Sequence, residues 1–190
     1  MAISPSDALR CWILSDRSNY QTCHIRLPDG ESMSAIAVNQ SYYGFRRRLM
    51  STSQALKILY TLSDPASPSH ITDVALTTNI KGAYFLWVRE AYALPKGNFI
   101  ANTSAAYQPV TFLKLPEGTP FAKISVPDLD QVLSSIAFDN NYYSIFKLEE
   151  DPDAVFELVN KLSQRGDEVL VAATPEGSAV CVLEAEAVPV

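Results

Sequence analysis

The sequence is poor in the residues from which metal sites, disulfide frameworks and catalytic centres are usually built. It has three cysteines, two histidines and seven glycines in 190 residues. The cysteines are widely spaced and odd in number, and no C-x-x-C pair is present, which argues against disulfides and against a zinc site. We interpret Cys11, Cys23 and Cys181 as buried or half-buried thiols of a protein in a reducing compartment.

The two histidines do not form a nucleophilic pair with a cysteine. His24 follows Cys23 on an expected strand, and neighbours on a strand point to opposite faces. His70 lies in a loop rich in proline and serine. Phosphate-binding glycine loops and the G-x-S-x-G turn of serine hydrolases are missing as well. We therefore expect a protein that is not an enzyme and that has no cofactor and no metal.

Long apolar runs are also missing. The longest, such as residues 83–88, fall far short of the roughly 18 to 20 residues of a membrane-spanning helix. The first ten residues lack the basic region and apolar stretch of a secretory signal. With 47% hydrophobic and 19% charged residues, the composition is typical of a globular protein with a sizeable core. We expect a cytoplasmic protein without a membrane span.

Charge is unevenly distributed along the chain, whose net charge is −6. Residues 1–95 hold nine Lys and Arg against seven Asp and Glu, whereas residues 96–190 hold six against fourteen. The acidic second half argues against nucleic acid as a partner. The expected partner is a protein with an acidic surface, which includes the acidic half of a second copy of this chain.

The sequence also repeats itself. Tyr42-Tyr43 recurs one hundred residues later as Tyr142-Tyr143, and Leu62-Ser63 recurs as Leu162-Ser163. Between these pairs, both segments have the i, i+1, i+3, i+4, i+7 apolar spacing of an amphipathic helix. The two stripes are Ala55, Leu56, Ile58, Leu59 and Leu62, and Val155, Phe156, Leu158, Val159 and Leu162.

The correspondence continues beyond these helices with a shift of 95 residues. Residues 73–76 align with residues 168–171, and Lys81-Gly82 aligns with Glu176-Gly177 between two β-like runs. Helical stripes look alike in unrelated proteins, but the shared order of tyrosine pairs, stripes and glycine turns favours duplication. We predict an α+β fold of two diverged tandem copies with mixed sheets, packed with approximate pseudo-twofold symmetry.

The predicted domains are residues 1–94 and residues 110–190, with residues 95–109 as a linker rich in Pro, Gly, Asn, Ser and Thr. Each copy is expected to follow the order β-β-α-β-α-β-β. The expected strands are 10–15, 22–27, 42–49 and the hairpin 74–92 in the first copy, and 111–115, 121–126, 142–148, 168–173 and 179–187 in the second.

Three helices are predicted beside one ambiguous segment. One spans residues 53–63. A second runs from the N-cap Asp151, through Pro152 at its first position, to Gly166 at its C-terminal end. The third is placed at residues 128–138, because Leu129, Val132, Leu133 and Ile136 fall on one helical face. Residues 31–38 fit a helix or a strand equally well.

One surface stands out in the first copy. Arg46, Arg47 and Arg48 follow Tyr42-Tyr43 on a predicted strand, at positions where the second copy has Phe146, Lys147 and Leu148. We expect this strand face to be buried in the second copy and to face water or a partner in the first. Arg89, which aligns with Glu184, extends the predicted binding surface.

Two functions are compatible with this sequence. Arginine recognises carboxylates with paired hydrogen bonds and tyrosine is a frequent interface anchor, which favours a non-enzymatic interaction factor: an assembly factor, adaptor or regulator. The alternative is a small-molecule sensor that binds an anionic ligand in the groove between the copies. The arginines also fit an exposed strand that uses charge for solubility and to prevent edge pairing.

Overall fold

The computed structural model describes residues 3–15, 19–97, 99, 108–127 and 129–190. In the first half of the described chain the elements are η1 (Pro5–Asp7), β1 (Leu9–Leu14), β2 (Gln21–Arg26), β3 (Ser32–Val38), β4 (Ser41–Leu49), α1 (Thr52–Leu62), β5 (Asp73–Thr78), β6 (Tyr84–Arg89) and β7 (Leu94–Pro95). In the second half they are β8 (Val110–Lys114), β9 (Ala122–Ser125), β10 (Val132–Phe138), β11 (Asn141–Glu149), α2 (Pro152–Gln164), β12 (Val169–Thr174), β13 (Gly177–Leu183) and β14 (Val188–Pro189).

All strands of the described chain belong to one mixed sheet, in the order β14-β9-β10-β11-β13-β12-β8-β1-β5-β6-β4-β3-β2-β7. β1 and β8 meet antiparallel at its centre. β1 pairs in parallel with β5, and β8 pairs in parallel with β12, while the remaining neighbours are antiparallel. The predicted α+β class and the mixed sheet are therefore confirmed.

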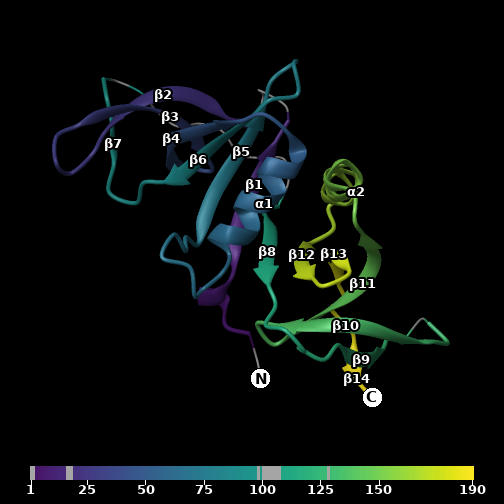
Figure 1. Ribbon diagram of the computed structural model, residues 1–190. Coiled ribbons are helices and arrows are strands. Elements are labelled where there is room, and N and C mark those ends of the chain that lie inside the picture. Colours follow the sequence, from purple (N-terminus) through teal and green to yellow (C-terminus); the bar gives the residue numbers. More distant parts are fainter. Residues whose placement is uncertain (1–2, 16–18, 98, 100–107, 128) are drawn as a thin grey trace.

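Both helices lie side by side against one face of the sheet (Figure 1) and touch each other. Their buried residues join those of the central strands in one hydrophobic cluster that spans both halves. In this cluster Tyr84 of β6 packs against Phe156 of α2 with ring centroids 5.4 Å apart, and Tyr60 of α1 packs against Phe112 of β8 at 6.2 Å. The two predicted domains thus share a core. Most of the predicted linker, residues 98 and 100–107, lies outside the described residues.

The two helices follow the sequence prediction closely, and their ends show why. Ser51 caps α1 by accepting a hydrogen bond from the Gln54 backbone, and Asp151 caps α2 by accepting one from the Asp153 backbone. Behind α2, Gly166 has φ +89°, and the backbone N–H groups of Gly166 and Asp167 return to carbonyls in the last turn. This Schellman arrangement ends the helix at the predicted glycine.

The helix predicted at residues 128–138 is wrong, because residues 132–138 form strand β10. Ile136 and Phe138 are buried on one side of β10, which is the period-two pattern of a strand. The same apolar residues fit a helical stripe, and only pairing with β9 and β11 on either side decides between the two. Residues 31–38, which were ambiguous, contain strand β3.

Two tight turns account for the difference between the predicted and the observed order. Asn39 and Gln40 join β3 to β4 with φ of 45° and 62°, and Asp139 and Asn140 join β10 to β11 with φ of 49° and 62°. Two successive positive φ angles suit a two-residue hairpin turn, and Asn and Asp tolerate them best. Each half therefore has four strands before its helix, and the predicted order β-β-α-β-α-β-β is wrong.

Both ends of the sheet are short and carry a proline. β7 and β14, the outermost strands of the described sheet, have two residues each and include Pro95 and Pro189. Proline lacks the N–H that a further strand would need. The outermost strands themselves therefore offer few backbone groups to a further strand.

Candidate functional site

The predicted Arg/Tyr surface is divided by the structure. Tyr43 is 1% exposed and lies in the core. Its hydroxyl donates to Asp73 Oδ1 at 3.1 Å and accepts a hydrogen bond from Trp12 Nε1 at 2.9 Å. Burial and the neighbouring carboxylate raise the pKa of Tyr43 above its usual range. Tyr43 is thus a structural residue that no partner reaches.

Two of the arginines and the other tyrosine also have partners within the chain. Arg89 lies 3.5 Å from Asp73, which also holds Arg10 at 2.6 Å. Arg46 forms an ion pair with Glu90. Tyr42 is half-buried, with its ring 6.4 Å from that of Phe99. A partner could bind Arg46, Arg89 or Tyr42 only by replacing these contacts within the chain.

Arg47 and Arg48 are exposed, and within the described residues neither side chain has an ion pair or a hydrogen bond. As neighbours on a strand they project to opposite faces of the sheet, and the bulge at Arg46 decides which face each one takes. Arg47 pairs in register with Leu86 on the helix-covered face, whereas Arg48 pairs with Phe85 on the open face. Directly paired residues project to the same side of a sheet. The bulge places Arg48 on the same face as Phe45, three positions earlier, and no pattern in the sequence predicts this bulge.

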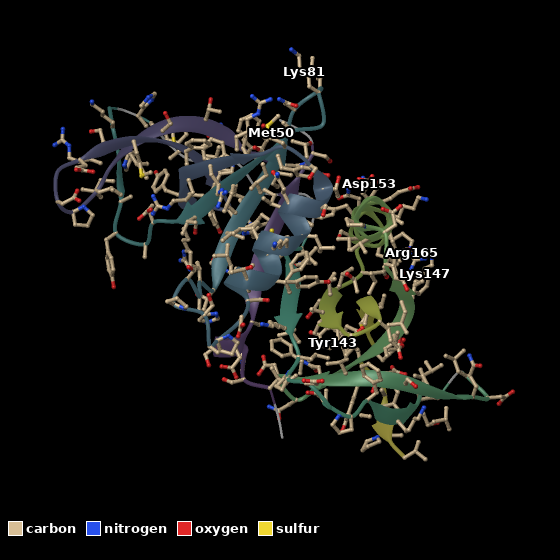
Figure 2. The ribbon with its side chains drawn as sticks, viewed as in Figure 1. Met50, Lys81, Tyr143, Lys147, Asp153 and Arg165 are labelled. Atoms are coloured by element: carbon tan, nitrogen blue, oxygen red, sulfur yellow. The ribbon has the colours of Figure 1, made fainter. Side chains whose placement is uncertain are left out.

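The corresponding strand of the second half is not buried as expected. β11 has a register shift between Ile145 and Lys147, so Phe146 occupies the bulge. Phe146 is 55% exposed and Leu148 is 41% exposed. The expectation that this face is covered in the second half is therefore wrong. Tyr143 is the inward residue there, and its hydroxyl donates to Glu168 Oε1 at 2.6 Å (Figure 2).

The open face of the first half contains a cavity of about 780 Å³. Its aromatic walls are Tyr20, Phe45, Phe85, Trp87 and Phe99. Neutral polar residues complete the lining: Gln21, Thr22, Ser34, Thr77, Thr78 and Asn79. We call this the aromatic cavity. Sequence reasoning missed it because its residues come from six separate segments that only the tertiary structure brings together.

Contacts among the walls hold the aromatic cavity in shape. The rings of Phe45 and Trp87 meet edge-on with centroids 5.4 Å apart, and Phe85 lies 6.4 Å from Phe45. Trp87 Nε1 donates to Thr77 Oγ1 at 3.0 Å, so the indole is fixed on both sides. The Gln21 side-chain oxygen is buried and has no hydrogen-bond partner in the described part of the chain.

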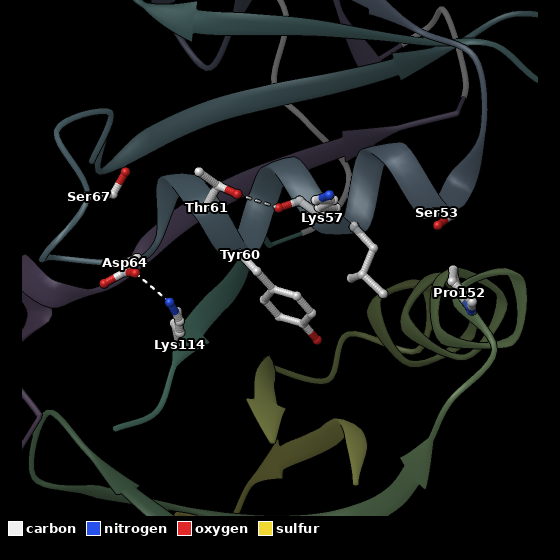
Figure 3. A pocket seen from close by; sticks show the side chains of 9 residues that line it. Ser53, Lys57, Tyr60, Thr61, Asp64, Ser67, Lys114 and Pro152 are labelled. Atoms are coloured by element: carbon white, nitrogen blue, oxygen red, sulfur yellow. Dashed lines mark hydrogen bonds and ion pairs between the residues drawn. The ribbon is translucent and has the colours of Figure 1, made fainter. Parts of the chain in front are cut away.

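A second cavity of about 420 Å³ lies at the seam between the two halves. Residues of α1 and the following loop form one wall, and Lys114 of β8 and Pro152 of α2 form the other (Figure 3). Tyr60 points from α1 toward the second half, where its hydroxyl donates to Ser178 Oγ at 2.7 Å. Lys114 crosses the seam to Asp64, with 2.5 Å between Nζ and Oδ2.

The seam cavity has charge of both signs. The hydrogen bond from Lys114 holds the pKa of Asp64 below its usual range. Lys57 lies exposed on the same rim with no ion pair from its ammonium group to any described residue. Burial raises the pKa of Tyr60 to about 12, so its hydroxyl stays protonated at neutral pH. An anion would find two cations there, one already shared with a carboxylate.

The cysteines and His70 have structural roles. All three cysteines are buried, as predicted, and burial raises the pKa of Cys181 to about 12. His70 has its two ring nitrogens 2.9 and 2.8 Å from the carbonyl oxygens of Leu62 and Ser6. Among the described residues, no group of three or more His, Cys, Asp or Glu is arranged to hold a metal ion.

Comparison of the chain with protein families, with curated proteins and with solved structures found no match. In the described part of the chain, no helix has the length and apolar character needed to cross a membrane. The geometry of the two cavities and the exposed arginines therefore carries the functional argument.

Proposed function

We propose that this protein is a non-enzymatic interaction factor whose first half binds a protein partner with an acidic surface. One observation carries the proposal. Arg47 and Arg48 stay exposed without an ion pair in the described residues, although the chain as a whole is acidic. An acidic protein that keeps neighbouring arginines unpaired has cations ready for carboxylates of another molecule.

The tandem-copy hypothesis supports the same function, because a duplicated unit is free to diverge on one side. The strand order outward from β1 and from β8 is the same in both halves. The central register is also self-complementary: Cys11 pairs with Val110, and Leu9 pairs with Phe112. Both halves have a bulge at the same place, at Arg46 and at Phe146. These features support the tandem-copy hypothesis, because an isologous dimer joined into one chain would have them.

The halves differ at exposed positions of the equivalent strands β4 and β11. Buried positions keep their character, as with Tyr43 and Tyr143, which each donate to a carboxylate. The exposed positions change from Arg46 and Arg48 to Phe146 and Leu148. Packing alone gives no reason for this change, since all four side chains are exposed. A binding role on the first half provides one.

The experiment that tests the proposal is affinity capture from native lysate with quantitative mass spectrometry. Wild type is compared with an Arg47→Ala/Arg48→Ala variant whose thermal unfolding is first checked to be unchanged. We expect an acidic partner that the wild type captures and the variant loses. Equal recovery by both proteins, or no specific partner for either, would contradict the proposed interaction surface.

The seam cavity favours a second candidate, a sensor of small anions. Lys57 and Lys114 line it from opposite halves, so an anion that bridges them would join the halves. A ligand that binds only the folded protein raises its melting temperature by mass action. We expect inorganic phosphate or citrate to raise the melting temperature of the wild type but not of a Lys57→Gln/Lys114→Gln variant. Lys81→Gln, in an exposed loop, is the matched control. An equal response from all three proteins would contradict the sensor.

A further inference from the structure

We propose that the aromatic cavity binds a short extended peptide segment of the partner, with an aromatic or large aliphatic side chain as its anchor and a carboxylate against Arg48. This inference rests on the proposed interaction function and names the chemistry of what is bound. It differs from the predicted Arg/Tyr surface, since only Arg48 of that surface takes part.

The walls provide the pocket for an anchor. Phe45 is 37% exposed although it contacts both Phe85 and Trp87, so a large part of its ring faces the cavity opening. Aromatic rings in a fixed cluster bind another ring or an aliphatic chain with little loss of conformational freedom. A volume of about 780 Å³ accommodates one such side chain together with neighbouring backbone.

The residues in and beside the aromatic cavity determine which charge the bound peptide carries. No Asp, Glu, Lys or Arg belongs to the described lining, whose polar groups are hydroxyls and amides. The hydroxyls of Thr22, Ser34 and Thr78 suit the N–H and C=O groups of a peptide backbone. Arg48 lies just outside, next to Phe85 on the same face, and its guanidinium has no carboxylate partner among the described residues. A peptide carboxylate is the complement to this unpaired charge.

The distance between Phe45 and Arg48 determines how far apart the anchor and the carboxylate lie in the bound peptide. Phe45 and Arg48 pair with Trp87 and Phe85, which are two positions apart on β6. Along an extended chain two residues span about 6.6 Å, and both side chains point the same way. The acidic residue of the peptide is therefore expected two positions from its anchor.

In the described part of the second half, the equivalent region of the open face is filled by packed side chains. Where the first half has Phe85 and Trp87, the equivalent β13 positions hold Ala179 and Cys181, which are fully buried. The N-terminal segment packs there through Ile3 and Ala8. One face of the molecule is thus filled by its own chain, while the face with large aromatic residues is hollow.

The test is a selection of peptides from an unbiased display library on the full-length protein. We expect enriched sequences to have an aromatic or large aliphatic residue with Asp or Glu two positions away. The enriched peptides are then measured by fluorescence anisotropy against three variants. Phe45→Ala and Arg48→Ala should each weaken binding about tenfold or more. Arg48→Ala removes a charge-assisted hydrogen bond, which contributes about that much, and Phe45→Ala removes the ring against which the anchor packs.

Lys161→Ala is the matched control, because Lys161 is an exposed cation on α2, in the other half of the molecule. It should leave the affinity unchanged. Phe45→Ala removes ring contacts with Phe85 and Trp87, so its affinity is measured at a temperature at which circular dichroism shows it folded. Failure to enrich any peptide, enrichment without acidic residues, or equal binding by Arg48→Ala would overturn the inference. So would binding of N-acetylphenylalaninamide as tight as that of the peptides, which would mark a small-molecule site.

The inference and the proposed function fail in different ways. If the captured partner is lost by Arg47→Ala but kept by Phe45→Ala and Arg48→Ala, the interaction function stands and the peptide site falls. If none of the proteins captures a partner and no peptide is enriched, both fall. If the partner is lost by Phe45→Ala and by Arg48→Ala alone, both stand.

Discussion

At the scale of single residues, Tyr60 connects the two halves. It leaves α1, packs on Phe112 of β8 and donates its hydroxyl hydrogen to Ser178 of β13. The sequence alone indicates little for Tyr60, because it lies outside the apolar stripe of its helix. Its contacts exist only because β8 and β13 come from the other half of the chain.

We predict that Tyr60 makes the protein sensitive to alkaline pH. Burial raises its folded-state pKa to about 12, whereas an unfolded tyrosine ionises near pH 10. The stabilisation from this phenol is therefore complete below about pH 10 and lost as pH rises toward 12. Urea unfolding of wild type should lose about 1 to 3 kcal/mol over this range from Tyr60.

The comparison is with Tyr60→Phe. At pH 7 this variant should lose about 0.5 to 1.5 kcal/mol, because the hydrogen bond to Ser178 is gone. Between pH 10 and 12 its stability should fall less steeply than that of wild type. Burial also raises the pKa values of Tyr43 and Tyr143. These two tyrosines therefore cause some loss of unfolding free energy with rising pH in both proteins. Parallel stability curves for the two proteins would contradict this role of Tyr60.

At the scale of elements, apolar spacing and cap residues in the sequence predicted both observed helices but not every strand. The stripes and caps of α1 and α2 agree with the observed helices to within a residue or two at either end. β10 has an equally regular apolar spacing and is nevertheless a strand. The difference lies in its neighbours: a positive-φ turn at Asp139-Asn140 folds β11 back onto it, and β9 pairs with its other side.

We predict that the two helices contribute equally to stability. Leu62 of α1 and Leu162 of α2 are both buried in the shared core. Leu62→Ala and Leu162→Ala should each cost about 2 to 5 kcal/mol, since each leaves a cavity among packed side chains. Lys57→Ala, on the exposed side of α1, should stay within about 0.5 kcal/mol of wild type.

Urea unfolding followed by circular dichroism measures these free energies. Ile58 and Leu158, from the predicted stripes, are only half-buried, so their replacement should cost less than that of the leucines. A cost below about 0.5 kcal/mol for either leucine would show that its helix does not pack as described.

At the scale of the whole molecule, one sheet and one core run through both halves. The central pair β1 and β8 joins the two sets of strands, and the main hydrophobic cluster takes residues from both helices. The two-residue outer strands with Pro95 and Pro189 close the sheet at its ends.

We predict that the molecule unfolds in a single cooperative transition. Both tryptophans, Trp12 and Trp87, belong to the first half, so their fluorescence reports on that half alone. Far-ultraviolet circular dichroism reports on both halves. Because the core is shared, the two urea curves should coincide. Loss of fluorescence at lower urea than loss of helix signal would instead indicate two domains that unfold separately.

The sequence by itself determined the features that depend on neighbours along the chain. The apolar stripes predicted α1 and α2, the cap residues predicted their ends, and the composition predicted buried cysteines. Most strands of the first half also followed from local patterns, such as residues 42–49 within β4. These properties depend on helical or strand periodicity and on backbone preferences. Both are local properties of a segment and do not depend on what it packs against.

Only the tertiary structure decided what depends on pairing between distant segments. β10 became a strand through its partners, the bulge at Arg46 brought Arg48 to the same face as Phe45, and Tyr43 was buried against Asp73. The aromatic cavity likewise exists only where several strands meet. Register between strands is set by contacts far apart in sequence, and a shift of one residue reverses every side chain, so local periodicity does not contain this information.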